Sequence, residues 1–559
     1  MDRLFGTDGI RGRAFDDPLD ENTVRRLGVA LAEELTSQSP GPRILLAGDT
    51  RASTMTLASW LASAFQAAGG AVVWGGVLPT PAVSHLLREG GFVAGVVVSA
   101  SHNPAEDNGI KILSPRGEKL ADERERRLEH LVGDARPATG PDLPTRDRTL
   151  GDRYLGHLVA SHESREPLSG LHLVVDTANG AASGLAQRLL EALGARVSAI
   201  ASSPDGSNIN ADCGAPDPAG LSDTVVELGA DGGLALDGDA DRAILVDERG
   251  RVLDGDDILL AWARQLQTEG RLLGGRVVAT VMSNFGLESA LRSEDIEVIR
   301  CPVGDRAVWI AMNEHRAVLG GEQSGHVICS HFGVSGDGLL TGTHVLAIAA
   351  RRGAPVSALS DLKRLPQILL NVPVSRKAEF ERLPGVSREL ARTQRDLAGR
   401  GRVLLRYSGT ESLARVMVEG INGESAGARG GLDDPAADQL RLLERQQMSA
   451  ALDDFKTRAR NAVGSLLGEG SKARHLELSD QDPGRYLNLR QPLRNRPLAR
   501  NVVLTARQVL GPWKVPQYGR RLLTHSGFGK GAGEQRATRP WPPHRGFDSF
   551  AAGHPRDLP

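Results

Sequence analysis

Three apolar segments of the sequence each run directly into a loop that is rich in chemically active side chains. The loops are Ser99–Pro104, Asp237–Arg242 and Gly320–His326. Upstream of each loop lies an earlier apolar strand and then a helix-like stretch, so the repeating unit is strand, helix, strand, loop. A unit of about 100 residues has the size of a small domain. The sequence therefore predicts one domain that is repeated three times.

The spacing of apolar residues predicts the regular elements of these units. The first strands are Arg43–Asp49, Leu171–Asp176 and Arg276–Val281, the helices Thr54–Ala68, Leu185–Leu193 and Leu287–Leu291, and the second strands Phe92–Val98, Gly233–Leu236 and Arg316–Leu319. This alternation is typical of a parallel sheet with helices on its faces. Because such sheets bind ligands at the carboxyl ends of their strands, we expect the three loops to converge on one cleft.

The chain after Pro366 has a different rhythm. A strand at Val403–Tyr407 enters the segment Ser408–Glu411, Ala414–Val418 returns as a second strand, and residues 433–467 have helical spacing. We predict an α/β protein of four domains: three similar domains with mixed or parallel sheets at residues 1–150, 151–253 and 254–365, and a smaller α+β domain at 366–467.

The charge of the chain is unevenly distributed. The 559 residues carry 67 Lys and Arg against 69 Asp and Glu, but residues 471–559 hold 16 basic and 6 acidic side chains. This end is rich in Pro, Gly and Arg and shows little periodicity, so we predict that residues 468–559 form a disordered basic tail. It could be an arm that binds nucleic acid. We favour a dispensable extension, or a segment read in an unnatural frame.

Several classes of protein are excluded by simple features. No apolar run reaches the roughly 18–20 residues of a membrane helix, and the charged N-terminus lacks the apolar region of a secretory signal. The three cysteines, Cys213, Cys301 and Cys329, are far apart and odd in number. They make neither a disulfide scaffold nor a zinc-binding pattern. We therefore expect a cytoplasmic, multidomain α/β protein.

Three alternating aspartates form the strongest local signal. Asp237, Asp239 and Asp241 fall on one side of an extended segment, where three carboxylates can meet one Mg²⁺. An EF-hand would place Glu248 at its twelfth position, but Arg242 stands where that loop requires glycine, and the flanking residues are strand-like. Solvated Asp-Gly turns are the remaining alternative.

Ser101 ends a buried strand, and Lys111 follows in the same loop region. The serine could be a nucleophile, a phosphate carrier or a turn former, and no G-x-S-x-G elbow surrounds it, so a hydrolase triad has no support. The lysine could donate to a phosphate or act as an acid or base. An ordinary surface lysine is the alternative.

Two further loops have the composition of ligand-binding segments. Gly320–His326 matches neither a Walker A nor a G-x-G-x-x-G pattern, but Glu322, Ser324 and His326 suit a polyhydroxy ligand such as a sugar. The segment Arg406–Thr410, with Arg415 one strand later, is typical of a phosphate nest with an arginine clamp. A tight loop and a polar hairpin turn are the respective alternatives.

Together these motifs resemble the α-D-phosphohexomutase superfamily over about residues 1–420. In chain order, Leu4–Gly12 is similar to its opening, Ser99–Pro104 with Asp107–Lys111 to its phosphoserine loop, Asp237–Arg242 to its metal loop, Gly320–His326 to its sugar-binding loop, and Arg406–Glu411 to its phosphate-binding loop. Gln323, Asn208–Asn210 with Cys213 and Gly214, and Val303–Arg306 resemble its glucosamine branch.

The resemblance implies a reaction and a distribution of roles. Ser101 would carry a phosphoryl group as phosphoserine, and this phosphate with Asp237, Asp239 and Asp241 would hold one Mg²⁺. Glucosamine 6-phosphate would become glucosamine 1-phosphate through glucosamine 1,6-bisphosphate, on the route to UDP-N-acetylglucosamine. The phosphate that is not reacting would be bound by Arg406, Ser408, Gly409, Thr410 and Arg415.

The remaining implied roles concern protons, charge and partners. Lys111 or His326 would be the general acid or base, Arg11, Lys111 and Arg242 would supply positive charge, and Glu322 and Ser324 would bind sugar hydroxyls. A kinase or a bisphosphate would prime Ser101. A homodimer is compatible with the sequence, and neither a membrane nor a nucleic acid is expected as a partner.

Three other functions stay open at this point. A phosphoglucomutase/phosphomannomutase would use the same mechanism on another sugar. A phosphatase of the aspartyl-phosphate type is weakly suggested by the spacing of Asp237 and Asp239, but Ser101 would then have no role. The last alternative is an inactive homologue that only binds sugar phosphates.

Overall fold

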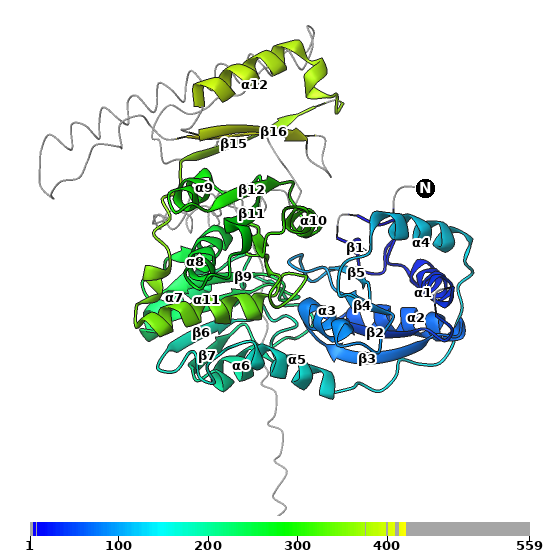
Figure 1. Cartoon of the computed structure of the whole chain (residues 1–559). Coiled ribbons are helices and arrows are strands. Elements are labelled where there is room, and N and C mark those ends of the chain that lie inside the picture. The colour runs from blue at the N-terminus through cyan, green and yellow to red at the C-terminus, as the bar shows by residue number, and fades with distance from the viewer. Residues whose placement is uncertain are drawn as a thin grey trace, which may run out of the picture. The chain divides into compact units, whose positions relative to one another are not determined.

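The computed structural model describes residues 4–6, 8–37, 39–374, 376–397, 401–407 and 413–420. These residues form four sheets, each of which belongs to one of four domains (Figure 1). The predicted helix at 433–467 and the predicted tail at 468–559 lie outside the described residues.

Domain I contains the mixed sheet β1-β5-β4-β2-β3. Its strands are β1 (Ile10–Arg13), β2 (Arg43–Gly48), β3 (Ala71–Val77), β4 (Ala94–Val98) and β5 (Asp107–Leu113), and its helices are α1 (Glu21–Thr36), α2 (Thr54–Ala67), α3 (Thr80–Arg88) and α4 (Asp122–Asp134).

Domains II and III continue the chain in the same style. Domain II has α5 (Thr149–Ala160), β6 (His172–Asp176), α6 (Ala186–Ala192), β7 (Arg196–Ile200), α7 (Ala219–Leu228), β8 (Gly232–Leu236), β9 (Ala243–Asp247) and β10 (Val252–Leu253). Domain III has α8 (Gly255–Thr268), β11 (Arg276–Thr280), α9 (Phe285–Arg292), β12 (Glu297–Cys301), α10 (Asp305–His315), β13 (Leu319–Gly321), β14 (Val327–Cys329) and α11 (Gly338–Arg352).

Domain IV is smaller and antiparallel. Its sheet has the order β15-β17-β16, with β15 (Gln367–Pro373), β16 (Gly401–Tyr407) and β17 (Leu413–Gly420), and α12 (Pro384–Leu397) packs against β16. Short 3₁₀ turns lie at Leu273–Gly275, Val356–Leu359 and Phe380–Arg382. The prediction of three similar α/β domains and a smaller α+β domain is confirmed.

The repetition is visible in the strand pairing. In each of the first three sheets a central strand (β2, β6 or β11) has parallel neighbours on both sides, and the strand that carries the polar loop (β4, β8 or β13) is followed by an antiparallel strand. The loop therefore leaves the same edge of the sheet in all three domains.

Each of these sheets contributes to two hydrophobic cores. In β2, Leu46 packs with α1 and α2 in a core confined to domain I, whereas Leu45 belongs to a core that runs through all three domains. The pattern recurs for Val174 and Val175 in β6 and for Val278 and Val277 in β11. Because strands buried on both faces are apolar at successive positions, this explains the runs in the sequence. The shared core holds the three sheets together at the ends from which their polar loops leave.

Three details differ from the sequence-based expectations. The strand predicted at Arg316–Leu319 begins only at Leu319, because α10 extends to His315 and ends with Arg316 in the left-handed conformation (φ 54°). Lys111 lies in strand β5, between β1 and β4, and not in a loop. The predicted boundary between residues 150 and 151 falls inside α5; the other domain limits stay predictions.

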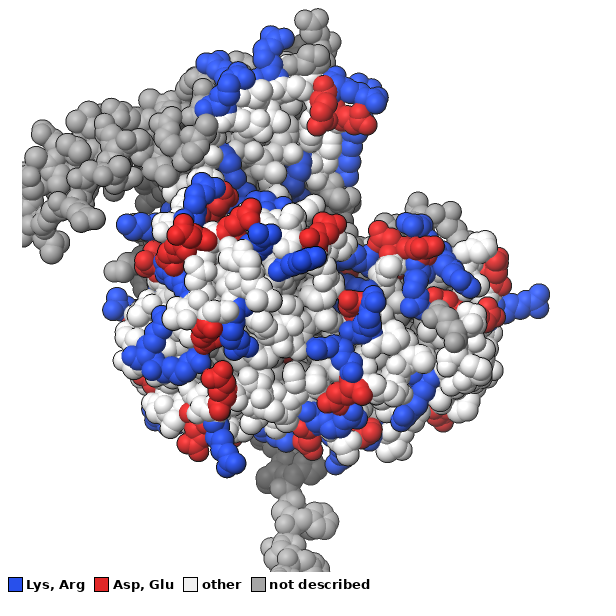
Figure 2. All heavy atoms as spheres, viewed as in Figure 1, with Lys and Arg blue, Asp and Glu red and all other residues white. Residues whose placement is uncertain are grey.

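The described surface carries both signs of charge. Lys and Arg side chains are interspersed with Asp and Glu side chains on the face seen in Figure 2. Among the helices of the described residues, none is long and apolar enough to cross a membrane.

Two helical glycines allow the effect of close packing to be compared with the effect of helix propensity. Gly28 lies where two helices of domain I pack together, and Gly156 lies where no neighbour is close. A Cβ on Gly28 of α1 would lie 2.6 Å from the carbonyl oxygen of Leu61 in α2, whereas one on Gly156 of α5 would meet nothing within 4 Å. We expect Gly28→Ala to lower the free energy of unfolding by about 1–3 kcal/mol through overpacking. Gly156→Ala should raise it by about 0.5–1 kcal/mol. Circular dichroism melting of both variants measures the contrast, and equal effects would contradict the packing argument.

Candidate active site

The phosphoserine-like loop leaves β4 and turns sharply at Ser101. The residue is buried and has a positive φ of 53°, and its N–H donates to Ser99 Oγ at 3.0 Å. Ser99 in turn donates to a carboxylate oxygen of Asp49, at the end of β2, at 2.6 Å. The serine is thus held at the carboxyl edge of the first sheet.

One hydrogen bond joins this loop to the aspartate loop of domain II. The hydroxyl of Ser101 donates to Asp237 Oδ2 at 2.7 Å. Asp237 directly follows β8. Side chains that follow the carboxyl ends of strands in two different sheets therefore meet here. This meeting agrees with the expectation that the loops after these strands converge.

The three aspartates form a buried cluster. Asp237, Asp239 and Asp241 each offer a carboxylate oxygen, and these oxygens lie within 4.8 Å of one another. Asp239 Oδ1 and Asp241 Oδ1 are buried and accept no hydrogen bond from the residues that the structure describes. Buried carboxylate oxygens without donors are suited to a hard divalent cation, so the donor set fits Mg²⁺.

Lys111 adds a compensating positive charge to this cluster, and Asp8 adds a further negative charge. The Lys111 ammonium lies 2.7 Å from Asp239 Oδ2, 3.7 Å from Asp241 Oδ2 and 3.5 Å from Asp8 Oδ2. Burial alone would lower the pKa of Lys111, but these carboxylates raise it above its ordinary value. In this arrangement the lysine is a cation that holds its proton.

The surroundings shift the pKa values of the three carboxyl groups in opposite directions. Burial, together with the neighbouring carboxylates, raises the pKa of Asp237 well above its usual range and also raises that of Asp241. Burial acts in the same sense on Asp239, but the Lys111 ammonium outweighs it and leaves the pKa of Asp239 below its usual value. The Arg242 guanidinium, followed by burial, lowers the pKa of His102 to about 3, so this imidazole is neutral near pH 7.

The sugar-loop residues of domain III reach the aspartate loop through the main chain. Arg242 and His326 form an isolated antiparallel bridge, and the N–H of Ala243 donates to the carbonyl of Gly325 at 3.0 Å. His326 is buried, and its Nδ1 has no hydrogen-bond partner among the described residues. The loop is therefore anchored beside the proposed metal ligands.

The other two predicted sugar ligands differ in exposure. Glu322 is partly exposed and accepts the N–H of Gly304 at 2.9 Å, while Ser324 is exposed. Arg11 donates to Asn103 Oδ1 at 3.3 Å and pairs with Asp8. It therefore lies beside the Ser101 loop.

The phosphate clamp predicted in domain IV is only partly described. Arg406 and Arg415 face each other in the antiparallel pairing of β16 with β17. Burial, and then the charge of Arg415, lower the pKa of Arg406. Two guanidinium groups on one face of a hairpin can both donate to the oxygens of one phosphate, so the pair suits a phosphate. Ser408, Gly409 and Thr410 lie outside the described residues.

Sequence reasoning missed three residues of the site. Arg51 donates to carbonyl oxygens of the Ser101 loop, Thr80 donates to Asp239 Oδ2 at 2.5 Å, and Asn210 donates to the carbonyl of Ser101 at 2.9 Å. Arg51 follows a buried strand, so the rule that placed the other loops could have found it. Asn210 lies in the segment Asn208–Asn210, which resembles the glucosamine branch without implying a role, and the sequence around Thr80 carries no signal.

Family comparisons agree with this geometry. Models of phosphoglucomutase/phosphomannomutase alpha/beta/alpha domains I, II and III match residues 2–138, 152–250 and 254–365, and the C-terminal domain model matches residues 369–429. With four domains matched and the serine and aspartate loops in contact, the chain belongs to the phosphoglucomutase/phosphomannomutase family, and it is a phosphohexomutase.

The names of similar proteins specify one sugar. A phosphoglucosamine mutase of Solibacter usitatus is 45% identical over 423 residues, which cover 75% of this chain and 94% of the relative. That of Symbiobacterium thermophilum is 46% identical over 433 residues, covering 76% and 96%. These names agree with the glucosamine branch inferred from the sequence.

Solved structures share the fold. A phosphoglucomutase/phosphomannomutase family protein of Burkholderia thailandensis has a TM-score of 0.65 at 24% identity, covering 83% of this chain and 97% of its own. An N-acetylphosphoglucosamine mutase of Aspergillus fumigatus, in complex with GlcNAc-6P and magnesium, has a TM-score of 0.51 at 20% identity, covering 75% and 92%.

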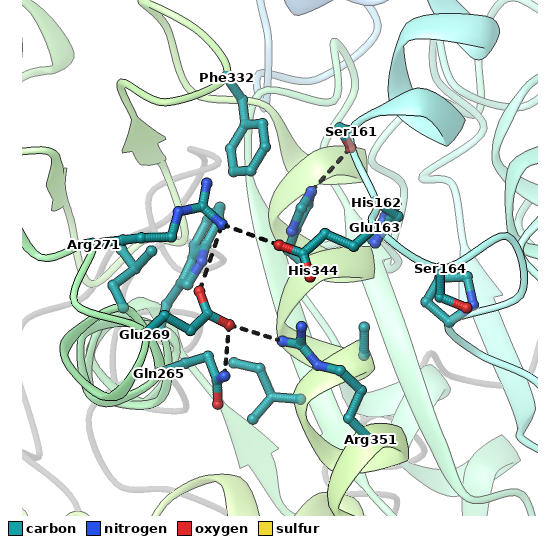
Figure 3. Close-up of a pocket in the computed structure, with 15 residues that line it drawn as sticks. Ser161, His162, Glu163, Ser164, Gln265, Glu269, Arg271, Phe332, His344 and Arg351 are labelled. Atoms are coloured by element: carbon teal, nitrogen blue, oxygen red, sulfur yellow. Dashed lines mark hydrogen bonds and ion pairs between the residues drawn. The ribbon is translucent and has the colours of Figure 1, made fainter.

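A separate cavity of about 130 Å³ lies away from these loops (Figure 3). It is lined by the segment after α5, by α8 and α11, and by Phe332, and none of its lining residues is a predicted site residue. His162 and His344 stack there with ring centroids 4.1 Å apart, and Trp262 lies nearly parallel to His344. Arg271 and Arg351 both pair with Glu269 at its rim.

The aspartate cluster predicts a metal-dependent gain in stability. Mg²⁺ that binds only the folded chain should raise the melting temperature, and a concentration of 100 times Kd corresponds to about 2.7 kcal/mol. Asp241→Asn should abolish this shift because it removes one anionic ligand of the cluster. Asp205→Asn, in an exposed loop, is the matched control and should keep it. A full shift in Asp241→Asn would exclude this cluster as the site.

The stacked imidazoles predict loss of stability in acid. Burial and the Arg351 guanidinium lower the pKa of His162 to about 4, below the roughly 6.5 of an unfolded histidine. Because the unfolded chain takes up the proton first, the free energy of unfolding should fall as the pH drops from about 6.5 to about 4. His162→Phe keeps a flat ring but cannot be protonated, so its melting temperature should fall less over this range. His130→Phe, on an exposed face of α4, should leave the decline unchanged.

Proposed function

We propose that the protein interconverts glucosamine 6-phosphate and glucosamine 1-phosphate through a phosphorylated Ser101. The observation that supports the proposal is the 2.7 Å hydrogen bond from Ser101 Oγ to Asp237 Oδ2, a carboxylate of the buried acidic cluster. The names of the relatives supply the sugar.

Each half-reaction moves one phosphoryl group and one proton. In the first, the bond between phosphorus and Ser101 Oγ breaks while phosphorus bonds to O1 of glucosamine 6-phosphate, whose proton passes to a base. The resulting glucosamine 1,6-bisphosphate turns round in the site. Its 6-phosphoryl group then returns to Ser101 Oγ, O6 takes a proton, and glucosamine 1-phosphate leaves.

Charge neutralisation is the main task of the site in such a transfer. Mg²⁺, when held by Asp237, Asp239, Asp241 and the phosphate on Ser101, would withdraw negative charge from the transferring group. The chain itself contributes the cationic side chains of Lys111, Arg242 and Arg11 around the same point. These side chains orient the phosphoryl oxygens and stabilise the charge that they carry.

Two residues divide the proton transfers in this proposal. Lys111, kept protonated by three carboxylates, acts as the acid or as a fixed cation. His326 is buried beside the aspartate loop, and its Nδ1 has no partner among the described residues, so it is the candidate base.

The binding of the substrate uses domains III and IV. Glu322 and Ser324 bind sugar hydroxyls in either orientation, and Arg406 and Arg415, which face each other across β16 and β17, bind the phosphate that is not reacting. Ser408, Gly409 and Thr410 complete this clamp in the proposal. Because the substrate presents either end, one clamp serves both half-reactions.

The remaining parts of the proposal concern how the enzyme works in the cell. Ser101 is primed by a kinase or by a 1,6-bisphosphate, the product feeds synthesis of UDP-N-acetylglucosamine, and the reaction takes place in the cytoplasm. A homodimer is compatible with this proposal. The second candidate function, supported by the description of the matching family models, is a phosphoglucomutase/phosphomannomutase with the same site and a neutral sugar.

A mutase assay tests this proposal. With Mg²⁺ and a trace of glucose 1,6-bisphosphate, we expect kcat/KM for glucosamine 6-phosphate to exceed that for glucose 6-phosphate by about 100-fold, or about 2.7 kcal/mol. Ser101→Ala should reduce turnover to background, while the exposed control Ser293→Ala should not. Preference for glucose or mannose 6-phosphate would favour the second candidate function. Normal turnover by Ser101→Ala would overturn both.

A further inference from the structure

The main chain at Ser101 adopts a conformation that a serine does not favour. Its φ of 53° lies in the left-handed region, which costs about 1 kcal/mol or more for a residue with a Cβ. Such a conformation persists only when neighbouring groups hold it in place. The contacts that hold the carbonyl group of Ser101 therefore bear on the position of its hydroxyl.

Arg51 provides the first of these contacts, from within domain I. Its side chain is fully buried and pairs with Asp49 at 2.9 Å. The guanidinium donates to the carbonyl oxygens of Ser101 at 3.0 Å, Asn103 at 2.9 Å and Asp107 at 3.0 Å, and also to that of Pro104. One buried cation thus binds most of the loop by its backbone.

Asn210 provides the second contact, from domain II. Its Nδ2 donates to the carbonyl oxygens of Ser101 at 2.9 Å and Asn103 at 3.0 Å, two of the acceptors that Arg51 also uses. Since carbonyl oxygens only accept hydrogen bonds, the amide must present its NH₂ group to them. The N–H of Asn210 itself donates to the carbonyl of Ala178 at 2.9 Å, which ties this residue to the end of β6.

The metal loop closes on the same point. A Cβ at Gly238, between the first two aspartates, would lie 2.5 Å from the carbonyl oxygen of Ser101 and 2.9 Å from Asn210 Nδ2. The Ser101 carbonyl is thus enclosed by Arg51, Asn210 and the backbone of the metal loop. The distance between the serine hydroxyl and the aspartates depends on this packing.

We infer that Asn210, with Arg51, is a positioning residue that fixes the Ser101 main chain for phosphoryl transfer, so that domain II sets the geometry of a serine carried by domain I. This inference rests on the proposed function. It gives a role to the motif Asn208–Asn210, which resembles the glucosamine branch and takes no part in the transfer steps proposed above. Asn210 touches neither the sugar nor the transferring group in this role.

The substitution Asn210→Asp gives the sharpest test because the side chain keeps its size. A carboxylate oxygen would then face the carbonyl oxygens of Ser101 and Asn103, turning two attractive contacts into repulsive ones. Asn210→Ala only removes them. We expect the single-turnover rate of Ser101 phosphorylation by glucose 1,6-bisphosphate to fall by about 100-fold in Asn210→Asp, the loss typical of a displacement of about 1 Å. The rate should fall less in Asn210→Ala.

Three readouts separate positioning from general structure. The Mg²⁺-dependent rise in melting temperature and the KM for glucosamine 6-phosphate should stay near wild-type values, while kcat falls with the phosphorylation rate. Asn313→Asp, which removes an exposed side-chain hydrogen bond to Trp309 in α10, is the matched control and should change none of these. Rates are compared at a temperature well below the lowest melting temperature of the set.

The outcomes are distinguishable. Phosphorylation of Ser101 at the wild-type rate in Asn210→Asp would overturn the inference and leave the proposed function intact. Loss of the Mg²⁺ shift together with the rate would also overturn it, because the variant would then have lost the site as a whole. If the wild-type chain takes up no phosphate at Ser101, the proposed function is wrong and the inference falls with it.

Discussion

A buried group of like charges is the constraint on which the rest of this structure depends. Asp237, Asp239 and Asp241 lie together in the interior, where uncompensated carboxylates are expensive. The cation nearest to them, Lys111, belongs to a different domain. Arg242 of domain II lies farther from the carboxylates, at 3.9–4.0 Å, so domain I supplies the nearer compensating charge, and the interface between the two domains is also the place where the chemistry is proposed.

The hydrophobic architecture makes this electrostatic contact reproducible. Each of the first three sheets turns one face to a core of its own domain and the other to a core that all three share. The core within each domain supports its sheet and the loop that follows the central strands. The shared core holds the three sheets, and so their loops, next to one another. The polar contacts between the sheets, such as the 2.7 Å hydrogen bond from Ser101 to Asp237, form where these loop ends meet.

Much of this arrangement follows from the sequence, and the failures have physical causes. The repeated strand-to-loop pattern predicts the three similar domains, and the spacing of the aspartates predicts that their carboxylates share one side. The place of Lys111 in β5 was missed because its strand begins directly after a polar turn, so its apolar alternation is short. Thr80 was missed because a contact between the start of α3 and Asp239 joins residues far apart in the chain and leaves no periodic trace.

Gly238 shows what such a contact means for exchanging parts between relatives. The space that a side chain would need at this position is filled by a carbonyl group of another domain, so the residue between two proposed metal ligands is set by a neighbour more than a hundred positions away in the chain. A chimera that joins domain I of one homologue to domain II of another must therefore match two backbones as well as two sets of side chains. The domains of this protein are consecutive segments of the sequence, but their contacting surfaces fit one another and cannot be exchanged independently.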